Sequence, residues 1–261
     1  MENFEGRDIS FSHPPVRQVV LTALFEPIDR MNSLDFGLLR LKWENQYPVL
    51  SETAPLPPWQ ADERGGFGFV GTDDSWPIPY CDFSNQEETR SIQFQSDRFI
   101  LAWKFQNSGL DYPGFFGLLS DMEERFSEFC DIVQNSGKDF PKVEKVMVNY
   151  VNIVDAIGAD EFTYGALSGW KEPYERVIRD YDYFGVRARY RGGSLGIPVS
   201  VGLDSVPNPS NSETESALIS FDSEKDVKDG QVWRDEITEL HDGVLKVFLE
   251  VMPESLRNSW E

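Results

Sequence analysis

Three arginines recur at every second position in one short segment, and this spacing gives them a common chemistry. Arg187, Arg189 and Arg191 are separated only by Ala188 and Tyr190. Successive side chains of a β-strand point to opposite faces of the sheet, so the three guanidinium groups would share one face. Arginine binds carboxylate and phosphate groups through paired hydrogen bonds, so the stripe predicts a site for a small anion. The alternative is cross-strand pairing with acidic neighbours.

Two further basic residues are candidates for the same site. Arg98 stands between Asp97 and Phe99, and Lys104 follows six residues later. Nothing in the spacing places either of them beside the arginine stripe, so their contribution rests on the fold.

A second candidate surface is acidic. The segment 208–242 holds ten acidic residues and three basic ones. Four of the acids lie on a predicted helix near the end of the chain: Asp235, Glu236, Glu239 and Asp242. Such a surface would attract a basic protein partner, for example a toxin or a nucleic-acid-binding subunit. The alternative is surface charge that serves only solubility.

Nucleotide and hydrolase signatures are absent or out of context. Residues 66–71 satisfy G-x-G-x-x-G, but a dinucleotide site needs a strand before this motif and a helix after it. The flanking segments 60–64 and 72–77 fit neither, which indicates a glycine-rich turn and strand. The sequence contains neither the phosphate-loop motif G-x-x-x-x-G-K-[ST] nor the nucleophile motif G-x-S-x-G. We therefore assign no catalytic residue.

Metal and cofactor chemistry find little support. The only histidines are His13 and His241, and Thr238 occupies the position at which a di-iron Glu-x-x-His motif needs glutamate. Asp73 and Asp74 could bind Mg²⁺, although a solvated loop is the simpler interpretation. We expect no metal and no cofactor.

Composition narrows the function classes. The chain of 261 residues carries 45 acidic and 24 basic residues, for a net charge of −21. This balance disfavours direct nucleic-acid binding and binding to an anionic membrane. Hydrophobic residues make up 40%, enough for a folded core.

Several features predict a cytoplasmic protein. The segment 1–6 lacks the features of a signal peptide, and no apolar run is long enough to span a membrane. Cys81 and Cys130 follow no metal or redox spacing. Their small number is typical of a reducing compartment, with one disulfide between them as the alternative.

The first half of the chain is predicted to contain mostly strands. They are expected at 18–25, 68–70, 91–95 and 98–105. A helix from Asn32 or Ser33 to Gln46 is predicted from apolar residues at helical spacing, namely Leu34, Leu38 and Leu41, with Phe36 and Leu39 as further members. The segment 55–59 contains P-x-x-P, a polyproline ligand pattern. We favour a stiff loop whose Trp59 packs on the body of the protein.

Two long amphipathic helices are the clearest predicted elements. One begins after Gly114 and ends at 135–137, and the other covers 231–251. A strand is predicted at 142–154 and a short helix at 161–168. Further strands are expected at 183–191, 196–203 and 218–221, with a flexible loop at 204–215.

The element order predicts an α+β fold. Strands do not alternate one for one with helices, which favours a mainly antiparallel, curved sheet with amphipathic helices packed on one face. A set of strands closed by a long helix occurs twice, so two similar halves, 1–137 and 138–261, could stand within a single integrated domain.

Several blocks spread over almost the whole chain resemble a sporadically distributed family of bacterial and archaeal proteins of about this length. They are 14–16, 19–21, 25–27, 47–48, 55–58, 93–104, 112–113 and 149–152, with Leu240-His241, Phe248 and Trp260. The most specific is Gln-x-Gln-x-Asp-Arg-Phe at 93–99. Glu261 departs from the pattern, which has glycine after the tryptophan. The resemblance implies one integrated unit and no particular activity, and a patchy distribution is typical of mobile defence and toxin–antitoxin modules.

Two functional hypotheses follow. In the first, the protein is a non-enzymatic, cytoplasmic interaction protein, a component of a defence or toxin–antitoxin module that binds a basic partner through its acidic surface. In the second, Arg187, Arg189 and Arg191, with Arg98, form a binding or enzymatic site for a carboxylate or phosphate. The sequence specifies neither the partner nor the oligomeric state.

Overall fold

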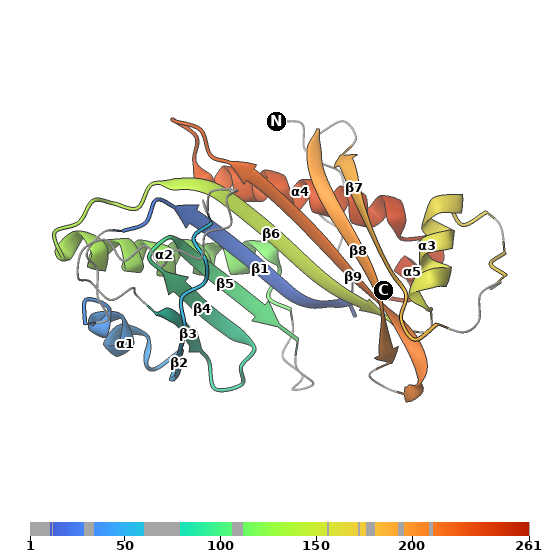
Figure 1. The fold of residues 1–261 in the computed structure, drawn as a ribbon, viewed down its shortest axis with the longest axis horizontal. Helices are drawn as coiled ribbons and strands as arrows, with labels where there is room; N and C mark the ends of the chain where they lie inside the picture. Colours follow the sequence, from blue (N-terminus) through green and yellow to red (C-terminus); the bar gives the residue numbers. More distant parts are fainter. Residues whose placement is uncertain are drawn as a thin grey trace. The chain divides into compact units, whose positions relative to one another are not determined.

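The fold was obtained as a computed structural model of the whole chain (Figure 1). It describes residues 11, 13–28, 34–59, 79–105, 112–155, 157–171, 173–175, 181–192, 196–208 and 211–260. The predicted strand at 68–70, the glycine motif at 66–71 and the pair Asp73-Asp74 lie outside these residues.

The described residues form nine strands in one open antiparallel sheet, which confirms the predicted α+β class (Figure 1). They are hydrogen-bonded in the order β2-β3-β4-β5-β1-β6-β9-β8-β7. The strands are β1 (Val16–Phe25), β2 (Val49–Thr53), β3 (Tyr80–Ser84), β4 (Arg90–Gln95), β5 (Arg98–Lys104), β6 (Val143–Val154), β7 (Gly185–Gly192), β8 (Ile197–Asn208) and β9 (Asn211–Asp226). The helices are α1 (Gly37–Trp43), α2 (Phe115–Asn135), α3 (Ala159–Ser168), α4 (Trp233–Val251) and α5 (Glu254–Asn258).

The order of elements repeats along the chain. A strand, a short helix, a run of strands and a long helix occur first as β1, α1, β2–β5 and α2, and again as β6, α3, β7–β9 and α4. In each series the first strand neighbours the last strand, and the second strand, β2 or β7, lies at an edge of the sheet. The first series has five strands and the second has four among the described residues, and an internal duplication with halves 1–137 and 138–261 stays a prediction.

The chain divides into two compact units, and each unit is built from segments that are not contiguous in the sequence. Unit 1 contains Met1–Val19, Val148–Glu224 and Ile237–Glu261, and unit 2 contains Val20–Met147 and Lys225–Glu236. Each unit is described separately below. The prediction of one integrated domain stays a prediction.

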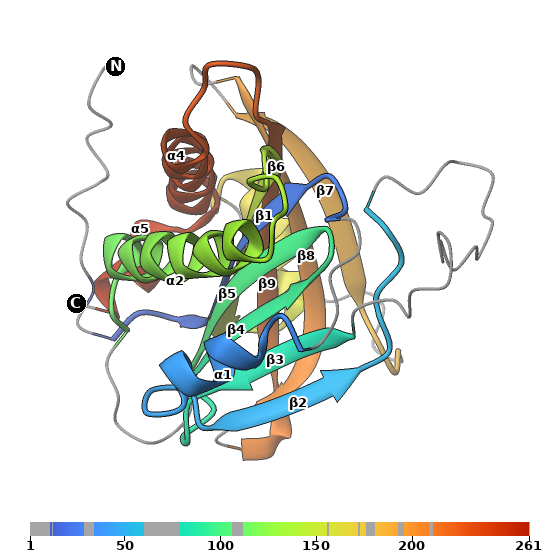
Figure 2. The same cartoon turned by 90° about the vertical axis from the view of Figure 1, so that its left-hand side faces the viewer.

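Helix α2 contributes Phe115, Phe126 and Phe129 to the aromatic core of unit 2. The helix lies along one face of the sheet (Figure 2). Its apolar positions recur every three or four residues, and Phe126 and Phe129 are buried. The ring of Phe129 lies 5.2 Å from that of Phe94 on β4 and 5.5 Å from that of Phe99 on β5. Gly114, with φ +77°, precedes the helix, and the helix ends before Ser136 as predicted.

The prediction for α1 was wrong in its length and in part of its buried face: Phe36 and Leu39 are buried as predicted, but Leu34, Leu38 and Leu41 are not. The helix covers only Gly37–Trp43, and the side chains directed into the core are Phe36, Leu39 and Trp43. The three leucines predicted to be buried are 59–88% exposed, namely Leu34, Leu38 and Leu41. Both sets have helical spacing, and the set with the two aromatic residues buries more apolar area.

A buried charge network joins α1 to α2. The indole N–H of Trp43 donates to Glu128 at 2.6 Å, and the Arg125 guanidinium bonds the same carboxylate at 2.6 Å. Lys42 lies 3.1 Å from the other oxygen of Glu128. The hydroxyl of Tyr47 donates to Asp121 at 3.0 Å. These bonds fix the amphipathic α1 on α2 through polar as well as apolar contacts.

The environment of Glu128 makes this contact dependent on pH. Burial raises the pKa of this carboxyl, but bonds from Trp43, Lys42 and Arg125 together outweigh it, so the pKa is lower than in the unfolded chain. Glu128 therefore stabilises the fold fully above the unfolded pKa of about 4.3, and this contribution is lost as the pH falls through the folded value. We expect the stability difference between wild type and Glu128→Gln to shrink in urea titrations between neutral pH and acid.

Asp131→Asn is the matched control, because this exposed carboxylate lies on the same helix. Asp131→Asn should change the free energy of unfolding at neutral pH by no more than about 0.5 kcal/mol, since it alters only an exposed side chain. A difference between wild type and Glu128→Gln that grows on acidification would contradict the assignment.

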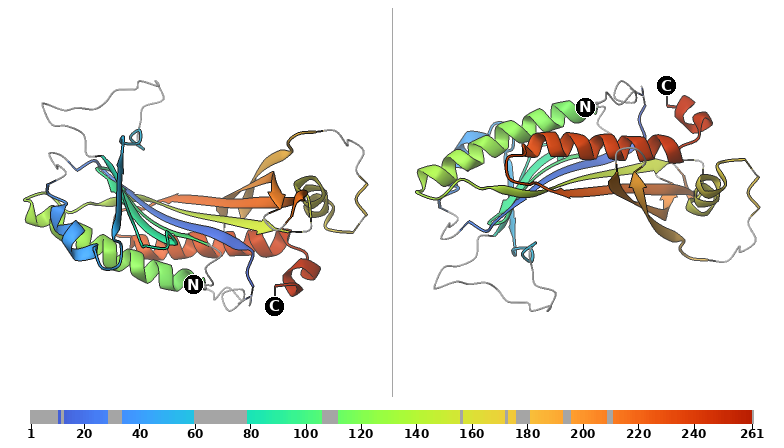
Figure 3. Two further views of the ribbon diagram at one scale, coloured as in Figure 1. Left: turned by 90° about the horizontal axis from the view of Figure 1, so that it is seen from below. Right: turned by 90° about the horizontal axis from the view of Figure 1, so that it is seen from above.

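In unit 1, residues 237–251 of α4 cover one face of the sheet (Figure 3). The buried residues Val244 and Val247 share a core cluster with Val201 of β8 and Phe221 of β9. At Gly243 a Cβ atom would lie 2.9 Å from the Ile197 side chain, so glycine permits the close approach of helix and sheet.

The loop predicted at 204–215 is instead largely strand. β8 continues to Asn208 and β9 begins at Asn211, and the two strands pair from Ser200↔Asp222 to Asn208↔Asn211. A register shift at Pro207 and Asn208 accommodates the proline. Cross-strand hydrogen bonds satisfy the backbone of these polar residues, which outweighs their weak intrinsic preference for strands.

Candidate anion-binding site

The arginine stripe lies on β7, the strand at one end of the sheet order. β7 pairs with β8 through its full length, with Arg187 opposite Gly202 and Arg189 opposite Ser200. Val199, Val201 and Leu203 alternate with these β8 residues and are buried in the core of unit 1. Arg187 and Arg189 therefore point to the opposite face of the sheet, away from α4, and both side chains are exposed.

Neither arginine side chain has an acidic partner in the part of the chain that the structure describes. Within the described residues, the side chains of Arg187 and Arg189 form no hydrogen bond and no ion pair. The residues directly opposite them on β8 are Gly202 and Ser200. The register therefore places no acidic residue of β8 directly opposite either arginine. Gly202 has no side chain, and this leaves room for the Ser220 hydroxyl. A Cβ atom added at residue 202 would lie 2.5 Å from that hydroxyl oxygen.

Two carboxylates on the same face are held by other groups. Asp222 is opposite Ser200 and accepts a hydrogen bond of 2.5 Å from the Asn149 side chain. Asp204 is opposite Gly185 and accepts a hydrogen bond from Tyr183. That bond is the main reason that the pKa of Tyr183 is raised above its ordinary value. The arrangement leaves the guanidinium groups available for an external anion.

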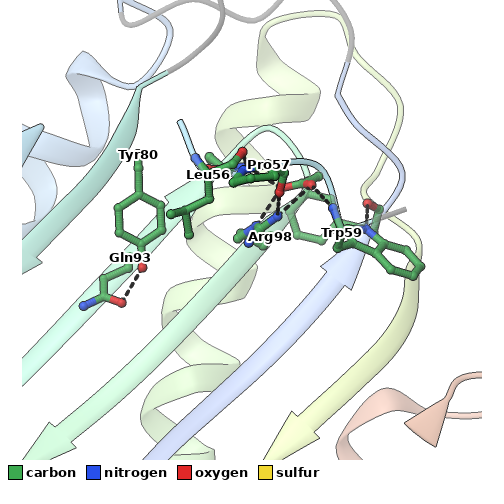
Figure 4. Close-up of polar contacts among 9 residues, drawn as sticks. Leu56, Pro57, Trp59, Tyr80, Gln93 and Arg98 are labelled. Carbon is green, nitrogen blue, oxygen red and sulfur yellow. Dashed lines mark hydrogen bonds and ion pairs between the residues drawn. The ribbon is translucent and has the colours of Figure 1, made fainter. Parts of the chain in front are cut away.

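The other proposed members of this site are placed differently. Arg191 lies on β7 opposite Pro198, and its side chain is outside the described residues. Lys104 is exposed at the end of β5 in unit 2. Arg98 begins β5 in unit 2, and its guanidinium bonds Asp97 at 2.8 Å and the carbonyl oxygen of Pro57 at 2.7 Å (Figure 4). Arg98 thus has a structural contact of its own.

The residues around Arg98 hold an extended segment on the sheet. We call Pro55–Trp59 the proline segment. The Gln95 amide accepts from the backbone N–H of Leu56 at 2.9 Å and donates to its carbonyl at 3.1 Å. The backbone N–H of Trp59 donates to Asp97, and its indole N–H donates to the carbonyl of Phe25 (Figure 4). The preferred interpretation of this segment, a loop with Trp59 packed on the body, is confirmed.

The Gln-x-Gln-x-Asp-Arg block that carries the family resemblance is the block that makes these contacts. Gln93, its first residue, accepts a hydrogen bond of 2.6 Å from Tyr80 on β3 and donates to Asp82 at 2.8 Å. Asp97 is 1% exposed and accepts bonds from Gln95 and Arg98 as well as from Trp59. The block is therefore a structural element of unit 2.

The predicted acidic surface is largely engaged within the fold. Glu236 and Asp242 are buried, and Glu236 lies 2.5 Å from Lys225. Glu239 is half-buried and Asp235 is exposed. Elsewhere in the same acidic segment two carboxylates are ion-paired, Asp226 with Lys145 at 3.6 Å and Asp229 with Lys142 at 2.5 Å. These partners reduce the charge that a basic protein would meet.

The cysteines and histidines lie in ordinary structural settings. Cys81 and Cys130 are buried, unbridged thiols, and burial raises the pKa of each to about 12, far from a reactive thiolate. His241 bonds the Tyr150 hydroxyl at 2.9 Å, and the backbone N–H of His13 donates to Trp260.

No group of three His, Cys, Asp or Glu side chains among the described residues could hold a metal ion. None of the helices that they form is long and apolar enough to cross a membrane.

No protein-family model matches the chain, and no curated protein shows significant similarity to it. The resemblance to a sporadically distributed family stays a prediction. The candidate site therefore rests on the geometry of β7, β8 and β9.

Proposed function

We propose that this protein is a binding protein whose ligand carries carboxylate or phosphate groups recognised by Arg187 and Arg189. The supporting observation is that these two exposed guanidinium groups share one sheet face and have no ion pair within the described residues. Two neighbouring guanidinium groups without an acidic partner repel each other. A bound anion would offset this repulsion.

The geometry favours this proposal over a basic partner on the acidic surface. In segment 208–242, Glu236 and Asp242 are buried, and Asp226 and Asp229 are ion-paired with lysines. The side chains of Arg187 and Arg189, in contrast, form no ion pair within the described residues. The overall charge of −21 repels anions at long range, so the ligand must gain its affinity from short bidentate contacts.

A thermal-shift titration tests the proposal. Citrate and inorganic phosphate are added at constant ionic strength, with chloride as the reference, and Tm is followed for wild type and Arg189→Ala. We expect the ligand-dependent rise in Tm to be lost in Arg189→Ala, because one charged hydrogen-bond pair contributes about 1–2 kcal/mol, or about 5- to 30-fold in affinity.

Lys104→Ala is the matched control, since it removes one exposed positive charge from the other unit. This variant should retain the full ligand response. Equal responses in Arg189→Ala and wild type would refute the proposal, and so would the absence of any response to both anions in wild type.

A further inference from the structure

The backbone of β7 offers a second mode of recognition beside its arginines. β7 is the last strand in the sheet order, and within the described part of the chain only β8 pairs with it. In an antiparallel edge strand, every second residue directs its N–H and C=O groups away from the sheet. These groups form a template on which another extended chain can pair.

The strand lacks most of the features that block such pairing. Its eight residues, GVRARYRG, include no proline, and the register with β8 is regular from Gly185 to Gly192. β-bulges and prolines are common protective devices at sheet edges. The protection that remains is the charge of the arginines, which repels a basic strand and attracts an acidic one.

The two faces of β7 would select different residues of an added strand. Arg187 and Arg189 lie on one face, and the half-buried Val186 and Tyr190 lie on the other, where Tyr190 packs against the core of unit 1. Side chains two residues apart on a strand are separated by about 6.5–7 Å, both in β7 and in a peptide paired with it. Acidic residues at alternate positions of that peptide would therefore each meet one arginine.

We propose that the ligand is an acidic peptide segment that adds to the sheet as a strand beside β7. Its carboxylates alternate with apolar residues, so that the acids contact Arg187 and Arg189 and the apolar residues cover Val186 and Tyr190. This inference rests on the proposed function, because it identifies the carrier of the anionic group. Backbone hydrogen bonds between the peptide and β7 would add to the binding affinity, and a free anion cannot form them.

Three synthetic heptapeptides test the inference by calorimetry on the full chain. The first alternates three glutamates with valines, the second has the same composition with the glutamates consecutive, and the third is the first peptide with alternate backbone nitrogens methylated on its pairing edge. We expect the first to bind at least about tenfold more tightly than either of the others. Binding should also slow the hydrogen exchange of β7 amides.

The outcomes separate the two proposals. Equal binding of all three peptides, lost in Arg187→Ala/Arg189→Ala, would overturn strand addition and leave anion binding in place. Tight binding of the first peptide that the double variant does not weaken would overturn the role of the arginines, because the peptide would then lie elsewhere. A first peptide that does not bind, together with a normal response to citrate or phosphate, would overturn strand addition alone.

Discussion

Replacing Asp97 by alanine should destabilise the protein by about 3–5 kcal/mol, the usual cost of leaving a buried charge without its partner. The Asp97 carboxylate accepts two bonds from Arg98, at 2.8 and 3.1 Å, and one from the Gln95 amide at 2.8 Å. A fourth comes from the backbone N–H of Trp59 at 3.1 Å. The Arg98 side chain is 12% exposed and also donates to the carbonyl oxygen of Pro57. In Asp97→Ala this guanidinium would keep the bond to Pro57 but lose its bonds to the Asp97 carboxylate.

Chemical denaturation in urea measures this loss, and Tm should fall by roughly 10 °C. Asp131→Ala is the matched control, since it removes an exposed carboxylate of α2 and should change stability by no more than about 0.5 kcal/mol. The double variant Asp97→Ala/Arg98→Ala should cost less than the sum of the single variants, because neither charge is then stranded. A cost below about 1 kcal/mol for Asp97→Ala would contradict the role assigned to this cluster.

The elements that sequence reasoning predicted well are those with one unambiguous buried face. In α2 the apolar residues from Phe115 to Val133 form a single stripe, and the predicted bounds agree with the structure. β6 likewise alternates along its length and was predicted to within one residue. The short strands β2 and β3 were not predicted. All side chains of β2 are exposed, so burial imposes no pattern on its sequence.

The arginine stripe was predictable because alternation alone places Arg187 and Arg189 on one face of a strand. The position of β7 at the edge of the sheet depends on long-range pairing and could not be read from the local sequence. Arg98 was assigned to the site for its charge, but it bonds Pro57, which lies 41 residues away in the chain. Only the fold brings that carbonyl to β5.

Two neighbouring leucines of α1 should differ strongly in their contribution to stability, because one is buried and the other is exposed. Leu39→Ala should cost about 2–5 kcal/mol, because Leu39 is fully buried and its truncation leaves a cavity between α1 and the core. Leu38→Ala, the same substitution one position earlier, should change stability by no more than about 0.5 kcal/mol, since Leu38 is 59% exposed and alanine favours helix.

This pair of variants tests the orientation of α1 directly. Both replace leucine by alanine, and the two positions are about 100° apart around the helix axis. Urea unfolding monitored by circular dichroism measures both. If α1 buried the stripe of Leu34, Leu38 and Leu41 that the sequence suggests, the order would reverse and Leu38→Ala would be the costly change. Equal costs for the two variants would also contradict the observed orientation. A large effect confined to Leu39 would show that α1 buries the face of Phe36, Leu39 and Trp43, the face from which the Trp43 indole reaches Glu128.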